Sequence, residues 1–439
     1  MGQATTKSCR CGETSQPAFL ISDAPRAALP SFPAPPGFPS LLHWLPTARR
    51  NGLELFPAGC FTQARVRHGL AWKRLSIISD PDSVREIFVT RPRAFRLCNL
   101  HLRLLRPSLG NGLIVAEGDD WRRLRRASIA LLAKVKEQSA AGAEQHDLPA
   151  QVGQFARDHG QAADFPEHLS RLVLNLLAIR ILGHSRVIAS PAITAAIERH
   201  REVSEKVDLL DVLGLAPQIT SDRMRRARGI ASSFDDRIRE ELAHRGDPSV
   251  PQVAVSEQRD LIVNLLTGFE SVWLTCLWSL LIMGHYPALG DWVRGDGMPG
   301  QRRKRLAAII RETLRLYPPL PFIYREPIED MDLPVGRVRK GEMICVSPYV
   351  VHRHHALWHD PEVFDCNRAA ETYQGFPYMP FGLGARRCVG AAAGPELAIE
   401  ILDGLLADHR PVASGEFPLP RGGMSLRPMG NPAISLERL

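Results

Sequence analysis

The sequence predicts one large, mainly α-helical domain with small β-sheets. Beyond about residue 80, apolar positions recur every three or four residues over long stretches, which is typical of helices that bury one face. Strand-like segments are short, and the sequence shows no internal repeat. The expected helices lie near residues 81–90, 119–135, 165–183, 192–206, 221–245, 256–284, 301–316 and 392–407. The expected strands lie near residues 64–78, 343–347 and the C-terminus, and the Gly- and Arg-rich stretch from Gly290 to Gly300 is expected to be a connecting loop.

The first 40 residues differ in composition from the rest of the chain. They are rich in Pro, Ala and Ser, and the cluster from Pro30 to Pro39 is expected to run extended along the surface. We therefore predict a Pro-rich, mobile N-terminal arm over residues 1–40 and a single domain over residues 41–439. Cys9 and Cys11 lack a second pair at ligand spacing, so no metal site is expected there.

The overall composition is that of a soluble globular protein with a sizeable core. The chain has 439 residues, of which 44% are hydrophobic and 23% are charged. Its eight cysteines show no regular disulfide spacing, which favours reduced thiols in an intracellular compartment. The net charge of +8 allows nucleic acid, an anionic membrane surface or an acidic protein as a partner, but does not select one. Because nothing beyond the charge points to nucleic acid, no nucleic-acid partner is expected.

No membrane span is expected. Residues 1–20 lack the continuous apolar stretch of a secretory signal. The longest apolar run, from Leu261 to Gly284, is long enough to cross a bilayer, but it contains Asn264, Glu270 and several hydroxyl side chains. A helix buried within the protein explains this run better, so we expect a soluble, cytoplasmic protein.

A glycine-rich loop around Cys388 is the strongest chemical signal in the chain. Its sequence from Phe381 to Gly390 is FGLGARRCVG. Glycines let the backbone turn tightly, approach a flat ligand closely and direct free amide N–H groups at the sulfur. A helix that follows the loop would place its positive N-terminus beside the thiol and favour a thiolate suited to soft-metal ligation. The alternative is a structural cysteine in a turn, but chance would supply this set of residues in on the order of one in 10⁵ chains of this length.

Two further patterns place pairs of residues on one helix face. Glu312 and Arg315 are three residues apart and precede a Pro pair that ends the helix. By themselves they would form a solvent-exposed ion pair of little energetic value. Trp121 and Arg125 are four residues apart and can offer an indole N–H and a guanidinium to a carboxylate. The alternative for the arginines around Trp121 is a solvated basic face or a nucleic-acid contact.

The long apolar helix carries one polar stripe. Asn264, Thr267, Ser271, Thr275 and Ser279 recur every three or four residues along it. Such a stripe either lines a cavity or hydrogen-bonds to the carbonyl groups of its own helix, and the spacing does not decide between the two.

In this order along the chain, these patterns resemble the motifs of the cytochrome P450 family. The glycine-rich loop is similar to the family's haem-binding pattern F-G-x-G-x-R-x-C-x-G. That resemblance implies that Cys388 is the axial ligand of the iron of haem b. It also implies that Arg386 contacts a haem propionate and that Phe381 belongs to the haem site.

The resemblance extends to the paired residues on the helices. Glu312 and Arg315 resemble the E-x-x-R element, which implies a structural network with Arg368 in the segment Pro361–Arg368. In that segment Cys366 stands where the family usually has proline, and Ala369 where it usually has phenylalanine.

Further haem contacts follow from the same resemblance. Trp121 and Arg125 resemble the W-x-x-x-R element, which implies two propionate contacts. Asp120 stands where relatives often have histidine, and it cannot donate in the same way. Arg325 falls where relatives place another propionate-binding arginine, and residues 421–428 resemble the terminal hairpin.

The polar stripe resembles the family's distal element [AG]-G-x-[DE]-T. The resemblance implies that Glu270 and Ser271 are catalytic and deliver protons to iron-bound dioxygen. Thr267 replaces the usual small residue, and Ser271 replaces threonine. Serine keeps the hydroxyl but loses the methyl group that restricts its rotamer, so proton delivery is expected to be leaky.

The resemblance implies a single-domain cytochrome P450 fold and a haem-thiolate monooxygenase. Such an enzyme inserts one oxygen atom from O₂ into a C–H or C=C bond of a small, apolar organic substrate, such as those of secondary metabolism. Electrons are expected from a separate ferredoxin- or flavodoxin-type protein with its NAD(P)H-dependent reductase. The segments expected to contact the substrate are residues 100–109, 165–215, 265–268, 321–323 and 422–425.

Two other interpretations stay open on the sequence. One is an enzyme of the same fold with atypical chemistry, namely a peroxygenase, an isomerase or an oxidative coupling enzyme. The acid and hydroxyl of Glu270 and Ser271 argue against peroxide-driven chemistry. The other is a haem-based sensor without enzymatic activity.

Overall fold

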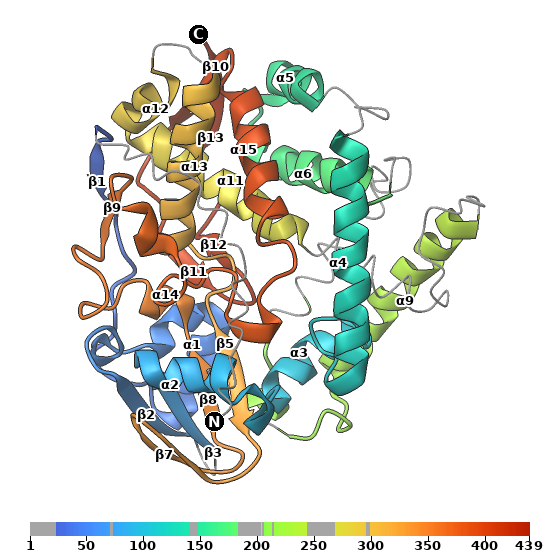
Figure 1. Ribbon diagram of the computed structural model, residues 1–439, viewed down its shortest axis with the longest axis vertical. Coiled ribbons are helices and arrows are strands. Elements are labelled where there is room, and N and C mark those ends of the chain that lie inside the picture. Colours follow the sequence, from blue (N-terminus) through green and yellow to red (C-terminus); the bar gives the residue numbers. More distant parts are fainter. Residues whose placement is uncertain are drawn as a thin grey trace, which may run out of the picture.

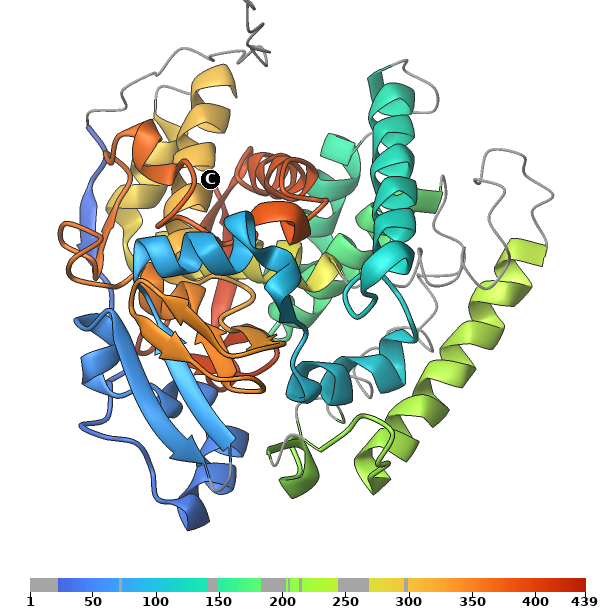
Figure 2. The same cartoon turned by 60° about the horizontal axis from the view of Figure 1, so that its bottom comes forward.

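The computed structural model describes residues 23–70, 73–140, 148–182, 203, 206–212, 215–243, 268–295 and 299–439. It confirms the predicted architecture, which is mainly α-helical with small sheets (Figure 1). Most helices gather in one part of the molecule, and the largest sheet lies at the lower left in Figure 1. Figure 2 shows the same separation from a second direction.

The helices and strands are short to medium in length. The described helices are α1 (Leu41–Arg50), α2 (Pro81–Arg85), α3 (Asn99–Leu109), α4 (Gly118–Ala140), α5 (Leu148–His159), α6 (Phe165–Leu182), α8 (Leu209–Val212), α9 (Asp222–Ala243), α11 (Phe269–His285), α12 (Pro287–Arg294), α13 (Pro299–Leu316), α14 (Pro348–Val351) and α15 (Ala393–Leu405). The described strands are β1 (Arg26–Ala28), β2 (Arg65–Leu70), β3 (Lys73–Ile78), β4 (Phe95–Arg96), β5 (Ile323–Pro327), β6 (Met331–Leu333), β7 (Gly336–Val338), β8 (Met343–Val346), β9 (Val363–Asp365), β10 (His409–Ala413), β11 (Pro420–Gly422), β12 (Leu426–Pro428) and β13 (Ile434–Arg438).

The largest sheet has five strands in the order β2-β3-β8-β5-β4. β2 and β3 form an antiparallel hairpin, and β8 joins β3 in parallel, so segments far apart in the sequence pair here (Leu75 with Met343). β5 and β4 continue the sheet in antiparallel fashion. The sheet therefore fixes β5, which carries Arg325, against the N-terminal part of the domain.

Helix α11 is the centre of the helical region. Almost all its residues are buried, as its nearly continuous apolar sequence predicts for a helix surrounded by protein. It packs against α6, α13 and α15 (Figures 1 and 2). Trp278 on α11 stacks on Tyr317 with ring centroids 4.1 Å apart. Within the described residues no single helix is long and apolar enough to span a membrane, and α11 with α12 meets the criteria only as a pair bent by 108°.

The prediction of a loop from Gly290 to Gly300 was wrong for residues 290–294 and 299–300. Residues 290–294 belong to α12, which begins at Pro287 and is followed by Gly295 at a φ of +48°, and residues 299–300 begin α13. Gly290 is not a helix breaker here. A Cβ atom at this position would lie 3.6 Å from the Met283 carbonyl oxygen, which is an ordinary van der Waals contact, so the packing of α12 on α11 does not require glycine here.

Among the described helices, those not predicted from periodicity are α1, α3, α5, α8, α12 and α14. The predicted helix over residues 192–206 and the first part of the one over 256–284 lie almost wholly outside the described residues. The domain boundary near residue 40 stays a prediction. Strand β1 lies before that boundary and pairs with β9, and Ala27 in it is buried.

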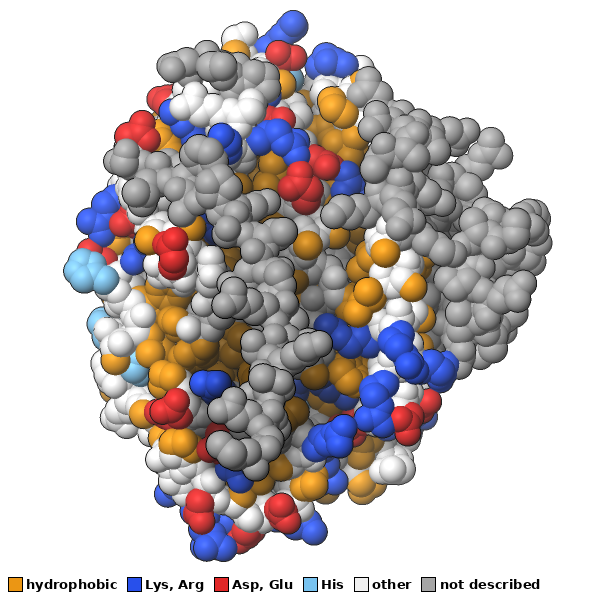
Figure 3. All heavy atoms as spheres, in the orientation of Figure 1, with side chains coloured by type: hydrophobic (Ala, Val, Ile, Leu, Met, Phe, Trp, Pro, Cys, Tyr) orange, Lys and Arg blue, Asp and Glu red, His pale blue; other side chains and the backbone are white. Residues whose placement is uncertain are grey.

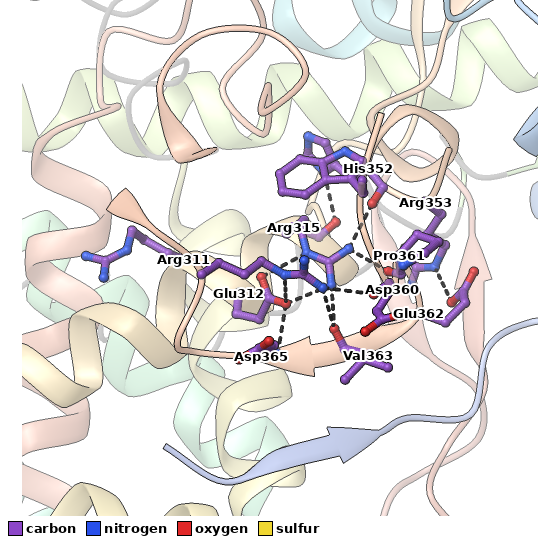
Figure 4. Close-up of polar contacts among 12 residues, drawn as sticks. Arg311, Glu312, Arg315, His352, Arg353, Asp360, Pro361, Glu362, Val363 and Asp365 are labelled. Carbon is purple, nitrogen blue, oxygen red and sulfur yellow. Dashed lines mark hydrogen bonds and ion pairs between the residues drawn. The ribbon is translucent and has the colours of Figure 1, made fainter. Parts of the chain in front are cut away.

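A buried ionic network holds the end of α13 against the segment around β9 (Figure 4). The side chains of Glu312 and Arg315 are completely buried, with Oε1 and Nη2 2.7 Å apart. All five N–H groups of Arg315 have acceptors, which are the two Glu312 oxygens and the carbonyl groups of His352, Pro361 and Val363. The pair is therefore an internal support and not a surface ion pair.

Arg368 joins the network as its third charged member. Its Nε lies 3.1 Å from Glu312 Oε1, and Tyr373 donates its hydroxyl to Oε2. Burial alone would raise the pKa of Glu312, but Arg315 and Arg368 lower it below its usual value. The Glu312 carboxylate therefore stabilises the fold at neutral pH, and this contribution is lost as the pH falls through its lowered pKa.

We expect Glu312→Ala to reduce the free energy of unfolding by about 3–5 kcal/mol, because it leaves the Arg315 charge buried without its carboxylate. Urea unfolding monitored by circular dichroism measures the loss. The matched control is Glu396→Ala, which removes the more exposed ion pair with Arg303 and should cost under about 1 kcal/mol. Equal losses in the two variants would contradict a buried network.

Candidate active site

The loop around Cys388 has the tight geometry that its glycines predict. Gly382 and Gly384 adopt φ values of +68° and +64°. A Cβ atom at Gly384 would clash with the backbone oxygen of Phe88, so only glycine fits this position. The Cys388 N–H donates to the Phe381 carbonyl over 2.8 Å and closes the loop. Phe381 itself is partly buried against the main core.

Among the described cysteines, Cys388 is the one that is exposed. The buried ones are Cys60, Cys98, Cys276, Cys345 and Cys366. Burial raises the pKa of Cys60 and Cys98 to about 12, so these thiols stay protonated. Protein atoms around the Cys388 sulfur also raise its pKa, but the Gly390 N–H and the charges of Arg125 and Arg387 act in the opposite direction. Cys388 thus has both the access and the supporting groups that a thiolate ligand needs.

Helices α11 and α15 place the distal residues near this loop. α15 begins at Ala393, shortly after Cys388, and packs against α11. A Cβ atom on Gly394 would lie 3.8 Å from Val272, so the first turns of the two helices are in contact. Ser271, one residue before Val272, is exposed.

The predicted propionate-binding residues come together from α4, β5 and the loop. The guanidinium groups of Arg386 and Arg125 lie 4.9 Å and 5.7 Å from the centroid of the Trp121 ring. Arg125 donates to the Arg387 carbonyl over 2.8 Å, and Arg386 donates to the Ala116 carbonyl over 2.6 Å. The Asp120 carboxylate pairs with Arg123 and supplies no hydrogen-bond donor to this site.

Arg325 completes the cluster of cations. It is partly buried, donates to the Tyr324 carbonyl and lies over the Phe88 ring. Desolvation, with a further contribution from Arg386, lowers the pKa of Arg325 to about 10. Within the described part of the chain, neither Arg325 nor Arg386 forms an ion pair with a carboxylate, although Glu117 is near enough to influence both. Two carboxylates, such as those of haem b, would supply the missing negative charge.

His101 on α3 is a polar neighbour of this cluster that the sequence did not single out. Its Nε2 is buried and has no hydrogen-bond partner among the described residues. Desolvation lowers the pKa of His101 to about 4, and the charges of Arg325 and Arg386 add to this effect. A lone histidine in a mainly apolar stretch carries no sequence signal that would have identified it.

The predicted distal acid, Glu270, is held by partners from the terminal hairpin. Its Oε1 accepts hydrogen bonds from Ser425 Oγ at 2.6 Å and Arg427 Nε at 3.0 Å. Arg427 Nη2 also pairs with the same oxygen. The hairpin formed by β11 and β12 was expected from residues 421–428, but its contact with Glu270 was not.

The polar stripe on α11 divides into two parts. Thr275 donates its hydroxyl to the Ser271 carbonyl over 2.7 Å, and Ser279 hydrogen-bonds Thr313 on α13. These two side chains serve the helix and its packing. Ser271 is left as the exposed hydroxyl, while Asn264 and Thr267 lie outside the described residues.

Comparison with known proteins points to one family. The chain matches the family model described as Cytochrome P450 over residues 33–271 and 298–395. Cyclooctatin synthase from Streptomyces melanosporofaciens is 26% identical over 406 residues, which cover 82% of this chain and 85% of that protein. The protein LUTEIN DEFICIENT 5, chloroplastic, from Arabidopsis thaliana is 27% identical over 372 residues, which cover 72% of this chain and 62% of that protein.

Solved structures show the same fold. CYP175A1 from Thermus thermophilus has a TM-score of 0.69 at 22% identity, covering 86% of this chain and 92% of that chain. The heme domain of cytochrome P450DA has a TM-score of 0.69 at 18% identity, covering 94% of this chain and 99% of that chain. With the family match and the geometry around Cys388, these likenesses establish that the chain belongs to the cytochrome P450 family of haem-thiolate monooxygenases, whose members bind haem b through a cysteine thiolate.

Proposed function

We propose that this chain binds haem b through Cys388 and inserts one oxygen atom from O₂ into a C–H or C=C bond of an apolar organic substrate. The observation that carries the proposal is the exposed Cys388 thiol in a glycine-shaped loop. The cations Arg325 and Arg386 support it, because they lie nearby without an ion-paired carboxylate among the described residues. Haem b fits this arrangement, since it brings one iron for the thiolate and two propionates for the cations.

The residues of the chain have separate tasks in this proposal. The bound haem supplies the activation of O₂. Cys388 holds the iron as a thiolate, and the Gly390 N–H limits the charge on the sulfur. The indole of Trp121 and the guanidinium of Arg125, together with the cations named above, bind and orient the propionates.

The proton-transfer residues are proposed to be Glu270 and Ser271. Ser271 is exposed at the start of α11, where its hydroxyl is free to donate and accept protons. Glu270 precedes it in the same turn and is anchored through one carboxylate oxygen. This arrangement suits a relay that passes protons from solvent to the reaction site.

We also propose an apolar substrate that lies against α3, the residues after α13 and the terminal hairpin. Leu100 and Leu102 on α3 and Phe322 before β5 are apolar, and the hairpin lies beside Phe322. The relatives named above include a protein named for lutein and a synthase named for cyclooctatin. A substrate from secondary metabolism agrees with those names.

The electron donor is proposed to be an acidic ferredoxin- or flavodoxin-type protein with its NAD(P)H-dependent reductase. Basic side chains gather over α4 in Figure 3. Arg122, Arg123 and Arg126 lie on that helix, and the first two pair with Asp119 and Asp120. Arg126 therefore contributes the least locally neutralised charge of the three to steering of an acidic donor.

The first expected outcome concerns the iron ligand. Cys388→Ser should lose the thiolate-type Soret band of the reduced, CO-bound protein and most of the bound haem, because a hydroxyl is a poor soft-metal ligand. The matched control is Cys276→Ser, a buried cysteine on α11, which should keep the band. Absorbance spectra of both purified variants decide the matter, and identical spectra would refute the ligand assignment.

The second expected outcome concerns the hydroxyl of Ser271. Ser271→Ala should raise the peroxide formed per NAD(P)H consumed, because a proton donor is lost, and Ser271→Thr should lower it or leave it unchanged. Thr275→Val is the control, since that hydroxyl is bonded to its own helix and should not affect peroxide. If Ser271→Ala forms peroxide at the wild-type level, Ser271 is not a proton relay and chemistry that does not activate O₂ is favoured.

The third expected outcome concerns the electron-donor protein. First-electron transfer should slow as ionic strength rises, because steering acts over a Debye length of about 8–10 Å. Arg126→Glu should slow it further without changing the haem spectrum, and Arg122→Glu should do so less. Arg410→Glu, on β10, makes the same charge change elsewhere on the surface as a control. Stopped-flow reduction under CO measures the rates; a rate that ignores both salt and Arg126→Glu would place the donor elsewhere.

A further inference from the structure

The terminal hairpin and the distal acid are joined by an ion pair that the sequence motifs do not contain. Glu270 lies in the first turn of α11, whereas Ser425 and Arg427 lie 155 and 157 residues further along the chain. Three donors from these two residues converge on one oxygen, Glu270 Oε1. All of them address Oε1, and among the described residues the second oxygen, Oε2, has no hydrogen-bond partner.

Arg427 is itself held in place. Its guanidinium lies 4.8 Å from the centroid of the Trp273 ring, and its Nε also donates to Ser425 Oγ over 3.2 Å. The Trp273 ring is fixed in turn, because its Nε1 donates to the Pro166 carbonyl on α6 over 3.0 Å. The guanidinium is thus a rigid donor with its stem largely buried, and its side chain is 12% exposed.

The hairpin does not need Glu270 to stay in position. The Asn51 side chain donates to the Pro420 carbonyl and accepts from the Gly422 N–H, at 3.0 Å and 2.7 Å. Leu426 is bonded on both sides of its backbone, to the Pro319 carbonyl and to the Trp278 indole. With these bonds already made, the member of the ion pair that gains most in order is Glu270, near the start of its helix.

We propose that Arg427 and Ser425 are positioning residues for Glu270. They fix Oε1 so that Oε2 is presented for proton transfer. In each transfer Oε2 takes a proton from a hydronium ion of the solvent, which becomes water, and gives it to Ser271 Oγ as the serine releases its own hydroxyl proton to the reaction site. The side chains then return to their starting protonation states. The inference rests on the proposed function and assigns to the hairpin a part in the proton chemistry of the same site.

The test uses the substrate-free holoprotein with a surrogate ferredoxin and ferredoxin reductase. The measured quantities are the fraction of NAD(P)H electrons recovered as peroxide and the solvent deuterium isotope effect on NAD(P)H consumption. Arg427→Met keeps the apolar stem on Trp273 but removes the donors. Loss of a charge-assisted hydrogen bond changes an orientational equilibrium by about tenfold or more. We therefore expect the peroxide fraction and the isotope effect to rise to the values of Glu270→Gln.

Rescue and a matched control separate positioning from hairpin stability. Arg427→Lys should restore part of the coupling, since it keeps one cationic donor. Arg421→Met is the control, because Arg421 lies opposite Arg427 in the same hairpin but donates to the carbonyl groups of Arg49 and Arg50. It should leave the peroxide fraction at the wild-type value. Ser425→Ala, which removes one of the three donors, should give an intermediate rise and serves if Arg427→Met does not fold.

A second measurement does not depend on turnover. Thermal unfolding of Glu270→Gln, Arg427→Met and the double variant should give non-additive shifts, with the double variant no less stable than the worse single one. Wild-type peroxide and isotope effects in both Arg427→Met and Ser425→Ala would overturn the proposal, as would additive unfolding shifts. Each variant is first checked for the thiolate-type CO spectrum. Absence of that band from the wild-type protein would overturn the proposed function, whereas its presence with unaltered coupling would overturn only the positioning role.

Discussion

The buried pair of Glu312 and Arg315 supports the loop that carries Cys388, the proposed iron ligand. The Arg315 carbonyl lies 2.8 Å from His352 Nδ1, and the Met379 N–H donates to Nε2 of the same ring. Only a neutral ring protonated at Nδ1 satisfies both contacts, and burial lowers the pKa of His352 to about 3. Since Met379 in turn accepts from the Gly382 N–H, a continuous set of hydrogen bonds runs from α13 to the Cys388 loop. The buried ion pair is thus connected through hydrogen bonds to the loop that carries Cys388.

Arg315 and Arg325 differ in how completely their N–H groups and their charge are matched by protein acceptors. Arg315 uses all its N–H groups on protein acceptors, which is what a structural ion requires when no water reaches it. Arg325 has the Tyr324 carbonyl and a ring face, and its pKa is lowered to about 10 because desolvation is not offset by an ion-paired carboxylate among the described residues. An arginine left in that state destabilises the folded chain unless an anion joins it. The difference separates an arginine that supports the fold from one that is proposed to bind a ligand.

The parts of the site that the sequence predicted are those whose signal is local. Cys388 is surrounded by glycines within a few positions, and Glu312 lies one helical turn from Arg315, so spacing alone links the partners. Arg427 carries no such mark, because its partner is 157 residues away and only the folded chain brings them together. Gly290 misled the prediction for a related reason. A glycine inside a helix has the same letter as one that ends a helix, and only the folded structure distinguishes them.

Two features of the proposed proton-transfer pair act in opposite directions. Ser271 lacks the methyl group of threonine, so its hydroxyl samples more rotamers and presents its proton less reliably. Glu270, the other member of the pair, is more constrained than its sequence suggests, because Ser425 and Arg427 hold one of its oxygens. In a relay of two groups the probability of a productive arrangement is the product of the two orientational probabilities. In the proposed relay a fixed carboxylate therefore offsets part of the freedom of the serine, and the hairpin that supplies Arg427 acts on proton transfer without touching the reacting atoms.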